Sequence, residues 1–351
     1  MLHSLGSNGS GQLGIGHEQD VSVPTECILP GDATPASIAT GGNHTIVLTT
    51  SGVPLSSGHA SDGRCGSVIG ASQPSSIGNS TSFSIFVSSE SNTDEISTYK
   101  HCAATWEASI LVTTDGKRIF TCGSGNKGEL GQGPGTVTSP QARCILDLAD
   151  KDTIVVDVSA GMSHAVAVLS DGSVYGWGVG RKGQLGDLKE DSWAPRIING
   201  IPFKAVRAAC GREFTYIVSD DKQGQHVVLG TDKWNIRSNA PDSARNWKDI
   251  GASWGNIFVL STSGVLHGWG RDDHGQLPPP GLPAIEKFAA GSEHVIAVSR
   301  AGDVLAWGWG EHGNCGIPTT TTGDVTGRCN TLPVPGRVHS VGAGCATSWI
   351  W

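Results

Sequence analysis

The segments GSNGSGQLG at 6–14, GSGNKGELG at 123–131 and GVGRKGQLG at 178–186 are three copies of one nine-residue glycine pattern. Close variants, GRDDHGQLP and GWGEHGNCG, stand at 270–278 and 308–316. A weaker copy, GHASDGRCG, lies at 58–66, and a nearly erased one, GTDKWNIRS, at 230–238. The copies recur about every 40 to 65 residues. Such regular recurrence is typical of repeat proteins, in which each unit packs against its neighbours. The seven copies therefore predict seven structural units in one body.

A second pattern alternates with the first and predicts antiparallel strands. The stretch AGMSHAVAVLSDGSVYGWG at 160–178 holds two apolar runs separated by an Asp-Gly turn. Related copies occupy 41–58, 103–123, 211–230, 251–270 and 291–308. Short apolar runs that flank a glycine turn are typical of β-hairpins. No stretch keeps a helical period for long, so we expect an all-β chain.

The two ends of the chain complement each other. The sequence starts inside one unit and ends with GAGCATSWIW at 342–351, which is only the first half of the hairpin pattern. Joining the ends closes a ring and removes open sheet edges. We therefore expect a single seven-bladed β-propeller over 1–351, with terminal strands that share one blade. The Ser/Thr-rich stretch 71–98 and the irregular stretch 317–334 are expected to be loop insertions.

Composition narrows the function classes. The formal net charge is -8 and charged residues make up 16% of the chain, which argues against a dedicated nucleic-acid binder. The nine cysteines form no C-x-x-C pair, and neither a signal-peptide pattern nor an apolar run near 18 residues occurs. We expect a reduced, intracellular setting, cytoplasmic with the nucleus as a second compartment, and no membrane contact.

Three glycine copies also match the G-x-G-x-x-G pattern of dinucleotide-binding loops, but a helix should follow such a loop. Here Pro- and Gly-rich loops follow, so we interpret the glycines as turns with positive φ. The leucines of the pattern are expected to fill blade interfaces: Leu13, Leu130, Leu185 and Leu277. No G-x-S-x-G nucleophile motif occurs, and we expect neither catalytic residues nor an enzyme.

Histidines recur at one repeat position, as His44, His164 and His294, and equivalent histidines in a β repeat are expected to be structural. We place Trp106, Phe214 and Trp254 at the same position in other units. Such aromatic residues can serve as extra packing or as exposed anchors for a partner, since aromatic anchors dominate interfaces. Both interpretations stay open at this point.

The last complete unit carries the densest polar and aromatic cluster, and the unit before it offers further polar and aromatic residues at the equivalent turn. His312, Cys315 and Cys345 could ligate a metal, but the H-x-x-C spacing is weak and zinc needs three or four ligands. We expect no metal and no cofactor, and a protein-binding rim instead. The expected partner-binding residues are Trp106, Phe214, Trp254, Trp269, Arg271, His274, Trp309, Glu311 and His312.

The two paired patterns resemble the regulator of chromosome condensation repeat family over essentially the whole chain. Within that family, the ultraviolet-B photoreceptor carries a repeated Gly-Trp-Arg-His-Thr motif that is missing here. Ubiquitin ligases of the family add a catalytic domain, for which no residues remain. The exchange factor for the small GTPase Ran is longer and carries a basic N-terminal tail, whereas this chain begins within a blade.

A more specific resemblance rests on LGSNG at 5–9, GGNHT at 41–45, GSEH at 291–294, WGWGEHGNCG at 307–316 and GCATSWI at 344–350. These residues are similar to the fungal alpha-tubulin suppressor, or killer-toxin-insensitivity, branch. The resemblance implies a non-enzymatic heterodimer with a small CSL-type zinc-finger electron carrier, which holds its metal through four cysteines. It also implies support of Elongator-dependent wobble-uridine modification of tRNA and of diphthamide synthesis on elongation factor 2.

The resemblance leaves two competing functions open. Nucleotide exchange on a Ran-like GTPase is the alternative, and a redox activity of Cys315 and Cys345 is a third hypothesis. Contact with Elongator would be indirect, and no direct nucleic-acid contact is expected.

Overall fold

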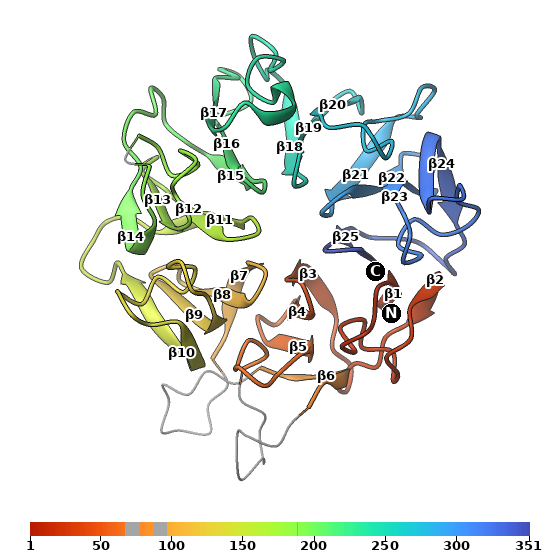
Figure 1. Ribbon diagram of the computed structural model, residues 1–351, viewed down its shortest axis with the longest axis horizontal. Helices are drawn as coiled ribbons and strands as arrows, with labels where there is room; N and C mark the ends of the chain where they lie inside the picture. Colours follow the sequence, from red (N-terminus) through yellow and green to blue (C-terminus); the bar gives the residue numbers. More distant parts are fainter. Residues whose placement is uncertain (67–77, 87–96, 188) are drawn as a thin grey trace.

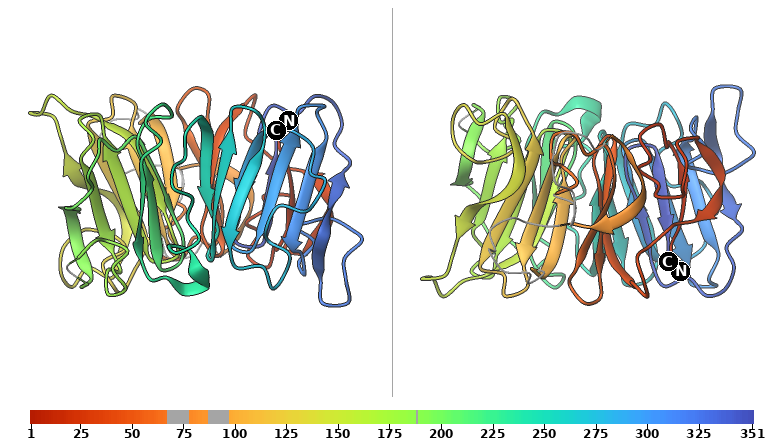
Figure 2. Two further views of the ribbon diagram at one scale, coloured as in Figure 1. Left: turned by 90° about the horizontal axis from the view of Figure 1, so that it is seen from above. Right: turned by 90° about the horizontal axis from the view of Figure 1, so that it is seen from below.

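The computed structural model describes residues 1–66, 78–86, 97–187 and 189–351 and folds them into seven antiparallel sheets. The sheets stand around a central axis like the blades of a propeller (Figure 1), and the ring forms a flat disc in side view (Figure 2). The expected all-β, seven-bladed architecture is confirmed. We number the blades one to seven around the ring, starting from the blade that the two termini share.

Each blade runs from an innermost first strand outward. Blade one holds β25 (Val341–Ala343), β26 (Thr347–Ile350), β1 (His3–Gly6) and β2 (Val21–Glu26). Blade two holds β3 (Pro35–Thr40), β4 (His44–Thr49), β5 (Pro54–Gly58) and β6 (Ser80–Ile85). Blade three holds β7 (Tyr99–Ala104), β8 (Ala108–Thr113), β9 (Arg118–Ser124) and β10 (Thr138–Asp147). Blade four holds β11 (Val155–Ala160), β12 (His164–Leu169), β13 (Val174–Gly178) and β14 (Ser192–Ile197).

The remaining blades differ in size. Blade five holds β15 (Arg207–Cys210), β16 (Phe214–Val218) and β17 (His226–Gly230), followed by the short 3-10 helix η1 (Lys233–Asn235). Blade six holds β18 (Trp247–Ala252), β19 (Asn256–Ser261) and β20 (Leu266–Gly270). Blade seven holds β21 (Ile285–Ala290), β22 (His294–Ser299), β23 (Val304–Trp309) and β24 (Asp324–Leu332).

The ring closes where the two ends of the chain meet. β1 pairs antiparallel with β26, with His3 opposite Ile350 and Gly6 opposite Thr347. Leu5 and Trp349 on these strands are fully buried. The shared terminal blade expected from the two half-units is therefore confirmed. Pairing between the ends makes closure of the ring part of the same cooperative sheet.

Two stretches interpreted as loop insertions contain strands. β6 lies within 71–98 and pairs with β5, with Ile85 opposite Leu55. Phe83 on β6 is buried and packs edge-on against Trp349, with ring centroids 6.1 Å apart. The parts 71–77 and 87–96 lie outside the described residues. Likewise, β24 occupies 324–332 within 317–334 and pairs with β23. Outer strands bury few side chains, so they show little of the apolar alternation that reveals strands in a sequence.

A hydrogen bond from the next blade reaches the glycine loop of every blade. At three junctions the donor is an indole of a third strand: Trp177 to the carbonyl of Glu129 (3.0 Å), Trp269 to Ile236 (2.8 Å) and Trp307 to Gln276 (3.1 Å). At the other four a hydroxyl donates: Ser57 to Gly11 (2.7 Å), Ser109 to Arg64 (2.5 Å), Thr215 to Gln184 (2.8 Å) and Ser348 to Asn314 (2.8 Å). These seven bonds join each blade to its neighbour.

The recurring histidines hold three of those hydroxyls in place. Nε2 of His44, His164 and His294 lies 3.0, 2.9 and 2.9 Å from the hydroxyls of Ser109, Thr215 and Ser348 on the following blade. Because each hydroxyl gives its own proton to a loop carbonyl, it must accept a proton from Nε2–H. Gly41 lies three residues before His44, and a Cβ atom on Gly41 would lie 2.3 Å from the His44 imidazole. The imidazole of His44 therefore requires a glycine at this position. These contacts agree with the structural role expected for these histidines.

Leucines of the glycine pattern fill the spaces between blades. Leu13, Leu130 and Leu185 are fully buried, as expected, whereas Leu277 is only half-buried. Burial of a leucine side chain contributes about 1.5–3 kcal/mol. The hydrogen-bonded loop therefore also carries an apolar residue into each of these interfaces.

We predict that acid destabilises the ring through the buried histidines. Burial lowers the pKa of His44 to about 3 and the pKa values of His164 and His294 to about 4. The unfolded chain takes up a proton on each histidine near pH 6.5 while the folded chain does not. The contribution of these neutral histidines to the free energy of unfolding is therefore fully present above pH 6.5 and is lost as the pH falls toward 4. The free energy of unfolding falls by up to ~1.4 kcal/mol per pH unit for each histidine.

Urea unfolding at pH 7 and pH 5 measures this loss. His164→Gln should lower the stability at pH 7 but make its fall toward pH 5 shallower. His267→Gln, at an exposed position of β20, is the control and should leave the pH dependence unchanged. An equally steep fall in His164→Gln would show that this histidine is not the group that titrates.

Candidate partner-binding surface

The connections between the first and second strands of the blades meet around the central channel. We call them the first turns: 41–43, 105–107, 161–163, 211–213, 253–255, 291–293 and 344–346. Backbone hydrogen bonds run from turn to turn: Gly42 N to Trp106 O (2.9 Å), Trp106 N to Met162 O (2.9 Å), Arg212 N to Trp254 O (3.2 Å), Trp254 N to Ser292 O (2.9 Å) and Ser292 N to Gly344 O (3.0 Å). The middle residues of the first turns therefore sit on a rigid support.

The position assigned to two tryptophans needs correction. Ala108 and Asn256 occupy the histidine position, since they face Gly123 and Gly270 as His164 faces Gly178. Trp106 and Trp254 lie two residues earlier, in the middle of the first turns. The error arose because blades three and six lack the glycine that marks the start of the G-x-x-H motif elsewhere. Phe214 does occupy the histidine position.

Trp106 and Trp254 meet although their blades are not neighbours. Both side chains are half-buried, and their ring centroids lie 5.8 Å apart at an angle of 42°. Both residues line the central channel together with small side chains of the other first turns. The two indoles therefore bridge the channel at this face, and their outer surfaces remain accessible.

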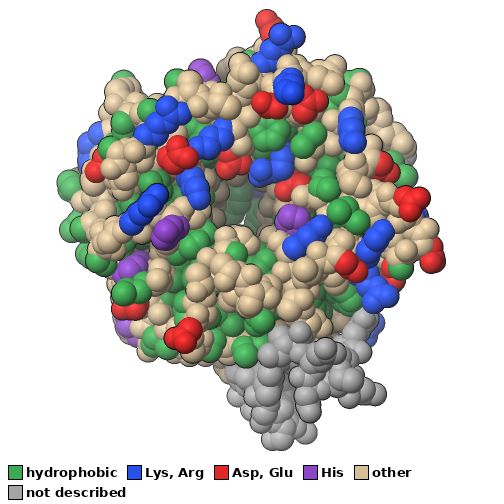
Figure 3. All heavy atoms as spheres, turned by 180° about the vertical axis from the view of Figure 1, so that it is seen from behind, with side chains coloured by type: hydrophobic (Ala, Val, Ile, Leu, Met, Phe, Trp, Pro, Cys, Tyr) green, Lys and Arg blue, Asp and Glu red, His purple; other side chains and the backbone are tan. Residues whose placement is uncertain are grey.

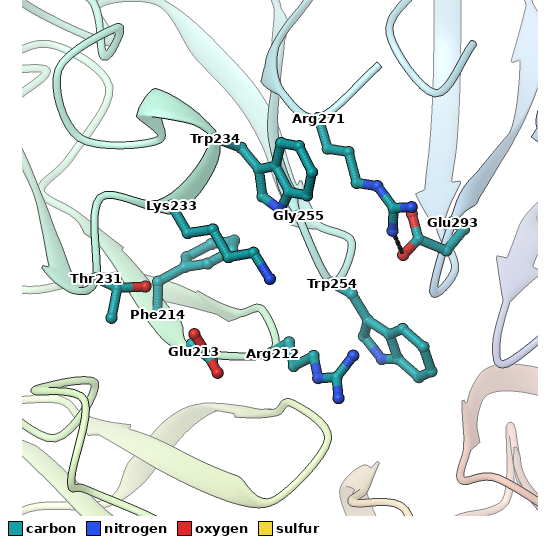
Figure 4. A pocket seen from close by; sticks show the side chains of 10 residues that line it. All are labelled: Arg212, Glu213, Phe214, Thr231, Lys233, Trp234, Trp254, Gly255, Arg271 and Glu293. Atoms are coloured by element: carbon teal, nitrogen blue, oxygen red, sulfur yellow. Dashed lines mark hydrogen bonds and ion pairs between the residues drawn. The ribbon is translucent and has the colours of Figure 1, made fainter. Parts of the chain in front are cut away.

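A pocket opens beside Trp254, among blades five, six and seven. Figure 4 shows its lining, in which Arg212 and Trp254 come from first turns and Lys233 and Trp234 from η1. The Arg212 guanidinium carbon lies 5.4 Å from the centre of the Trp254 ring. Lys233 Nζ and the Arg271 guanidinium carbon lie 5.4 and 5.2 Å from the centre of the Trp234 ring. Such cation–π contacts hold the cationic groups in position.

The backbone of η1 is strained. Trp234 has a φ of 64° and Asn235 a φ of 55°, in the left-handed region, which costs about 1–2 kcal/mol for a residue other than glycine. Trp234 is also 43% exposed, an unusual situation for so large an apolar side chain. Strained backbone of this kind clusters at binding sites. The strain presents Trp234 to the solvent at the mouth of the pocket.

A second aromatic cluster lies at the end of β23 and on the loop that follows it. The rings of Trp309 and His312 are in edge contact, with centroids 5.3 Å apart. Nδ1 of His312 lies 2.7 Å from a carboxylate oxygen of Asp20, and Glu311 beside it is exposed. Trp309 N donates to the backbone oxygen of Glu293 (2.9 Å), whose carboxylate pairs with Arg271 (2.5 Å). Glu293 therefore connects the pocket to the Trp309 cluster.

The expected partner-binding residues fall into three groups. Trp106, Trp254 and Arg271 lie at the channel and the pocket, and Trp309, Glu311 and His312 form the second cluster. Two others are interior: Phe214 is 3% and Trp269 8% exposed, and both belong to the core of blades five and six. They cannot act as exposed anchors, because Trp269 holds the loop of blade five and Phe214 fills the histidine position. His274 lies between the first two groups: it follows Arg271 by three residues and bonds Asp324 (2.9 Å), which pairs with Trp309 across β23 and β24.

Sequence reasoning missed Arg212, Lys233, Trp234 and Glu293. A signal was present in the nearly erased copy at 230–238, where Trp234 stands at a position that is Ser, Asp, Lys or His in the other copies and Asn235 replaces their glycine. By itself the loss of the glycines indicates only decay of the repeat. In the structure the same change creates the η1 segment and one wall of the pocket.

The opposite face is shown in Figure 3, where basic, acidic and histidine side chains surround the central opening. Arg207 starts β15 at the end away from the first turn and lies 3.3 Å from both Asp157 and Asp249 on the neighbouring innermost strands. Lys248 pairs with Glu286 in the same way (2.6 Å). These ion pairs join neighbouring blades, so we assign them to the ring itself.

The residues proposed for a metal or a redox function are poorly suited to it. Among the described residues no three His, Cys, Asp or Glu side chains gather as a metal site. Cys315 is fully buried, and its burial raises the pKa of its thiol, which disfavours the reactive thiolate. In the part of the chain that the structure describes, no helix is long and apolar enough to cross a bilayer.

The closed ring of seven antiparallel blades, with aromatic and cationic side chains gathered on one face, defines the chain as a β-propeller. The model of the RCC1-like domain family matches residues 1–350. The chain belongs to this family.

Relatives cover the whole chain. The RCC1 repeat-containing protein C10F6.04 of Schizosaccharomyces pombe is 33% identical, over 100% of this chain and 98% of the relative. The secretion-regulating guanine nucleotide exchange factor of Mus musculus is 28% identical, over 99% of this chain and 82% of the relative. Human WBSCR16 superposes with a TM-score of 0.83 at 18% identity, over 100% and 99% of the two chains. Prp20p of Saccharomyces cerevisiae superposes with a TM-score of 0.82 at 20% identity, over 99% and 90%.

We predict that the Trp106–Trp254 contact couples blades three and six. Aromatic pairs contribute about 0.5–1.5 kcal/mol beyond their buried area. A double-mutant cycle of Trp106→Ala and Trp254→Ala in urea unfolding should give a coupling free energy of that size. A cycle of Trp106→Ala with Trp309→Ala, which lies in the other cluster, should be additive. Additive effects in the first cycle would show that the indoles do not interact.

Proposed function

We propose that this propeller is a non-enzymatic adaptor that docks a small protein partner on the first-turn face. The observation that carries the proposal is the pair of half-buried indoles, Trp106 and Trp254, held by the hydrogen-bonded first turns. Aromatic and arginine side chains on a rigid support are the typical centres of protein interfaces. The second cluster around Trp309 extends this surface toward blade one.

The partner that we propose is a small CSL-type zinc-finger electron carrier. The support comes from the resemblance of WGWGEHGNCG at 307–316 and GCATSWI at 344–350 to the fungal alpha-tubulin suppressor branch. The first of these segments contains Trp309, Glu311 and His312, and the second runs through the first turn of blade one. The partner would bring its zinc with four cysteines of its own. The heterodimer would support wobble-uridine modification of tRNA with Elongator, and diphthamide synthesis on elongation factor 2.

Nucleotide exchange on a Ran-like GTPase is the second candidate. It is supported by the mouse relative, which matches 99% of this chain and is named as an exchange factor. An exchange factor must displace the nucleotide from a GTPase, whereas an adaptor only needs to bind its partner. The two functions therefore predict different results with purified proteins.

We predict that Trp254→Ala and Trp309→Ala each weaken binding of the CSL-type protein at least tenfold. Truncation of an aromatic anchor typically costs about 2 kcal/mol or more, and about 1.4 kcal/mol already corresponds to a tenfold loss of affinity. Isothermal titration calorimetry measures the affinity. The control is Val265→Ala, which removes an apolar side chain that is 51% exposed between β19 and β20. This change should leave the affinity for the partner unchanged. Wild-type affinity in both tryptophan variants would remove the docking surface from consideration.

The alternative makes the opposite prediction in a nucleotide-release assay. Under the adaptor function, the propeller should not accelerate release of labelled GDP from Ran. Faster release, lost again in Trp254→Ala, would favour the exchange function. Binding of the CSL-type protein should be measured with the same preparation, so that an inactive sample cannot produce the negative result.

A further inference from the structure

We infer that the pocket beside Trp254 receives an extended acidic segment of the docked partner, whose carboxylates pair with Arg212 and Lys233. The inference rests on the proposed function, in that a protein partner must dock on the first-turn face. It adds the chemistry of the contact: the pocket selects negative charge, whereas the indoles around it supply the apolar contact area.

The pocket holds cations that the described chain leaves without an anionic partner. Arg212 and Lys233 are exposed, and neither forms an ion pair within the described residues. Each is held over an indole ring, Arg212 over Trp254 and Lys233 over Trp234. A guanidinium stacked on an aromatic ring keeps its N–H groups free at its edge. These donors are thus oriented before any ligand arrives.

The acidic residues of the pocket do not neutralise these two cations. Glu293 is occupied by Arg271 (2.5 Å) and by the Gln276 side-chain amide (2.9 Å). Asp273 also pairs with Arg271 (2.6 Å). Glu213 follows Arg212 directly, but Figure 4 shows its carboxylate pointing away from the Arg212 guanidinium. The positive charges of Arg212 and Lys233 therefore remain available, beside the single carboxylate of Glu213.

The backbone at η1 and at Gly255 determines where the aromatic and cationic side chains of the pocket lie. The left-handed conformation at Trp234 and Asn235 brings both Lys233 and Trp234 to the mouth of the pocket. Gly255 makes room below, because a Cβ there would lie 2.9 Å from Cβ of Arg271 and 3.4 Å from a ring carbon of Trp234. The strained backbone of η1 and the absence of a side chain at Gly255 together keep the Trp234 indole between Lys233 and Arg271.

An acidic peptide fits these observations better than a free phosphate. The two available cations come from separate elements, a first turn and η1, so carboxylates on successive residues can reach them one by one. The nearby carboxylates of Glu213 and Glu293 repel a compact dianion more strongly than single carboxylates. The pocket also borders Trp254, so a peptide can continue onto the proposed docking surface.

Fluorescence anisotropy with a labelled ten-residue peptide of alternating Asp and Gly tests the inference. We expect binding that weakens as salt rises, and a loss of at least fivefold in Arg212→Ala and in Lys233→Ala. The control is Lys222→Ala, which also removes one positive charge but lies between β16 and β17. This variant should retain wild-type affinity for the peptide. A peptide of alternating Asn and Gly should not bind. Thermal unfolding monitored by circular dichroism confirms that the variants fold.

Three results would overturn the inference: equal binding of the neutral peptide, wild-type affinity in both pocket variants, or complete competition by millimolar inorganic phosphate. The same variants should be titrated with the CSL-type protein. If that protein binds wild type and Arg212→Ala equally while Trp254→Ala weakens it, the acidic-segment inference fails and the docking surface stands. If the acidic peptide binds through the pocket but the CSL-type protein does not bind at all, the proposed partner fails and the pocket stands.

Discussion

One hydrogen bond, repeated at every blade junction, holds this ring together. A loop carbonyl of each blade accepts a proton from the next blade, and the donor is either a tryptophan indole or a hydroxyl. The two donors have different requirements. The indole reaches the carbonyl by itself, as Trp177 does, whereas three of the hydroxyls are oriented by a histidine of the preceding blade. An unpaired buried carbonyl would cost about 1–3 kcal/mol, so each junction needs one solution or the other.

This constraint separates structural from functional residues. The sequence predicts Trp269 as an interface anchor, yet its indole serves a blade junction, as His44, His164 and His294 do. Side chains in the middle of the first turns have no such task, because the turns are joined through their backbones. A change of side chain at these positions leaves the backbone hydrogen bonds between the turns in place. That freedom explains why Trp106, Arg212 and Trp254 differ from the glycine, methionine, serine and cysteine of the other blades.

The sequence predicted the fold well and the site in part. The glycine pattern and the half-units at the two ends were sufficient for seven blades and for closure, because both follow from local turns and strand pairing. The strand at 324–332 was missed, since an outer strand buries only part of its side chains. Trp106 and Trp254 were assigned to the wrong register because a missing glycine shifted the apparent motif. Lys233 and Trp234 were missed because their importance depends on neighbours 20 or more residues away, such as Trp254 and Arg271.

By itself the sequence determined the repeat, its β class, the number of blades and the residues that differ between copies. Turn chemistry and strand periodicity are local, so one chain read in order contains them. Only the tertiary structure decided which deviations face the solvent and which fill a junction. It brought Trp106 and Trp254 together across the channel, and among the described residues it gave Arg212 and Lys233 no anionic partner. Those outcomes depend on closure of the ring, which places blades that are distant in sequence around one axis.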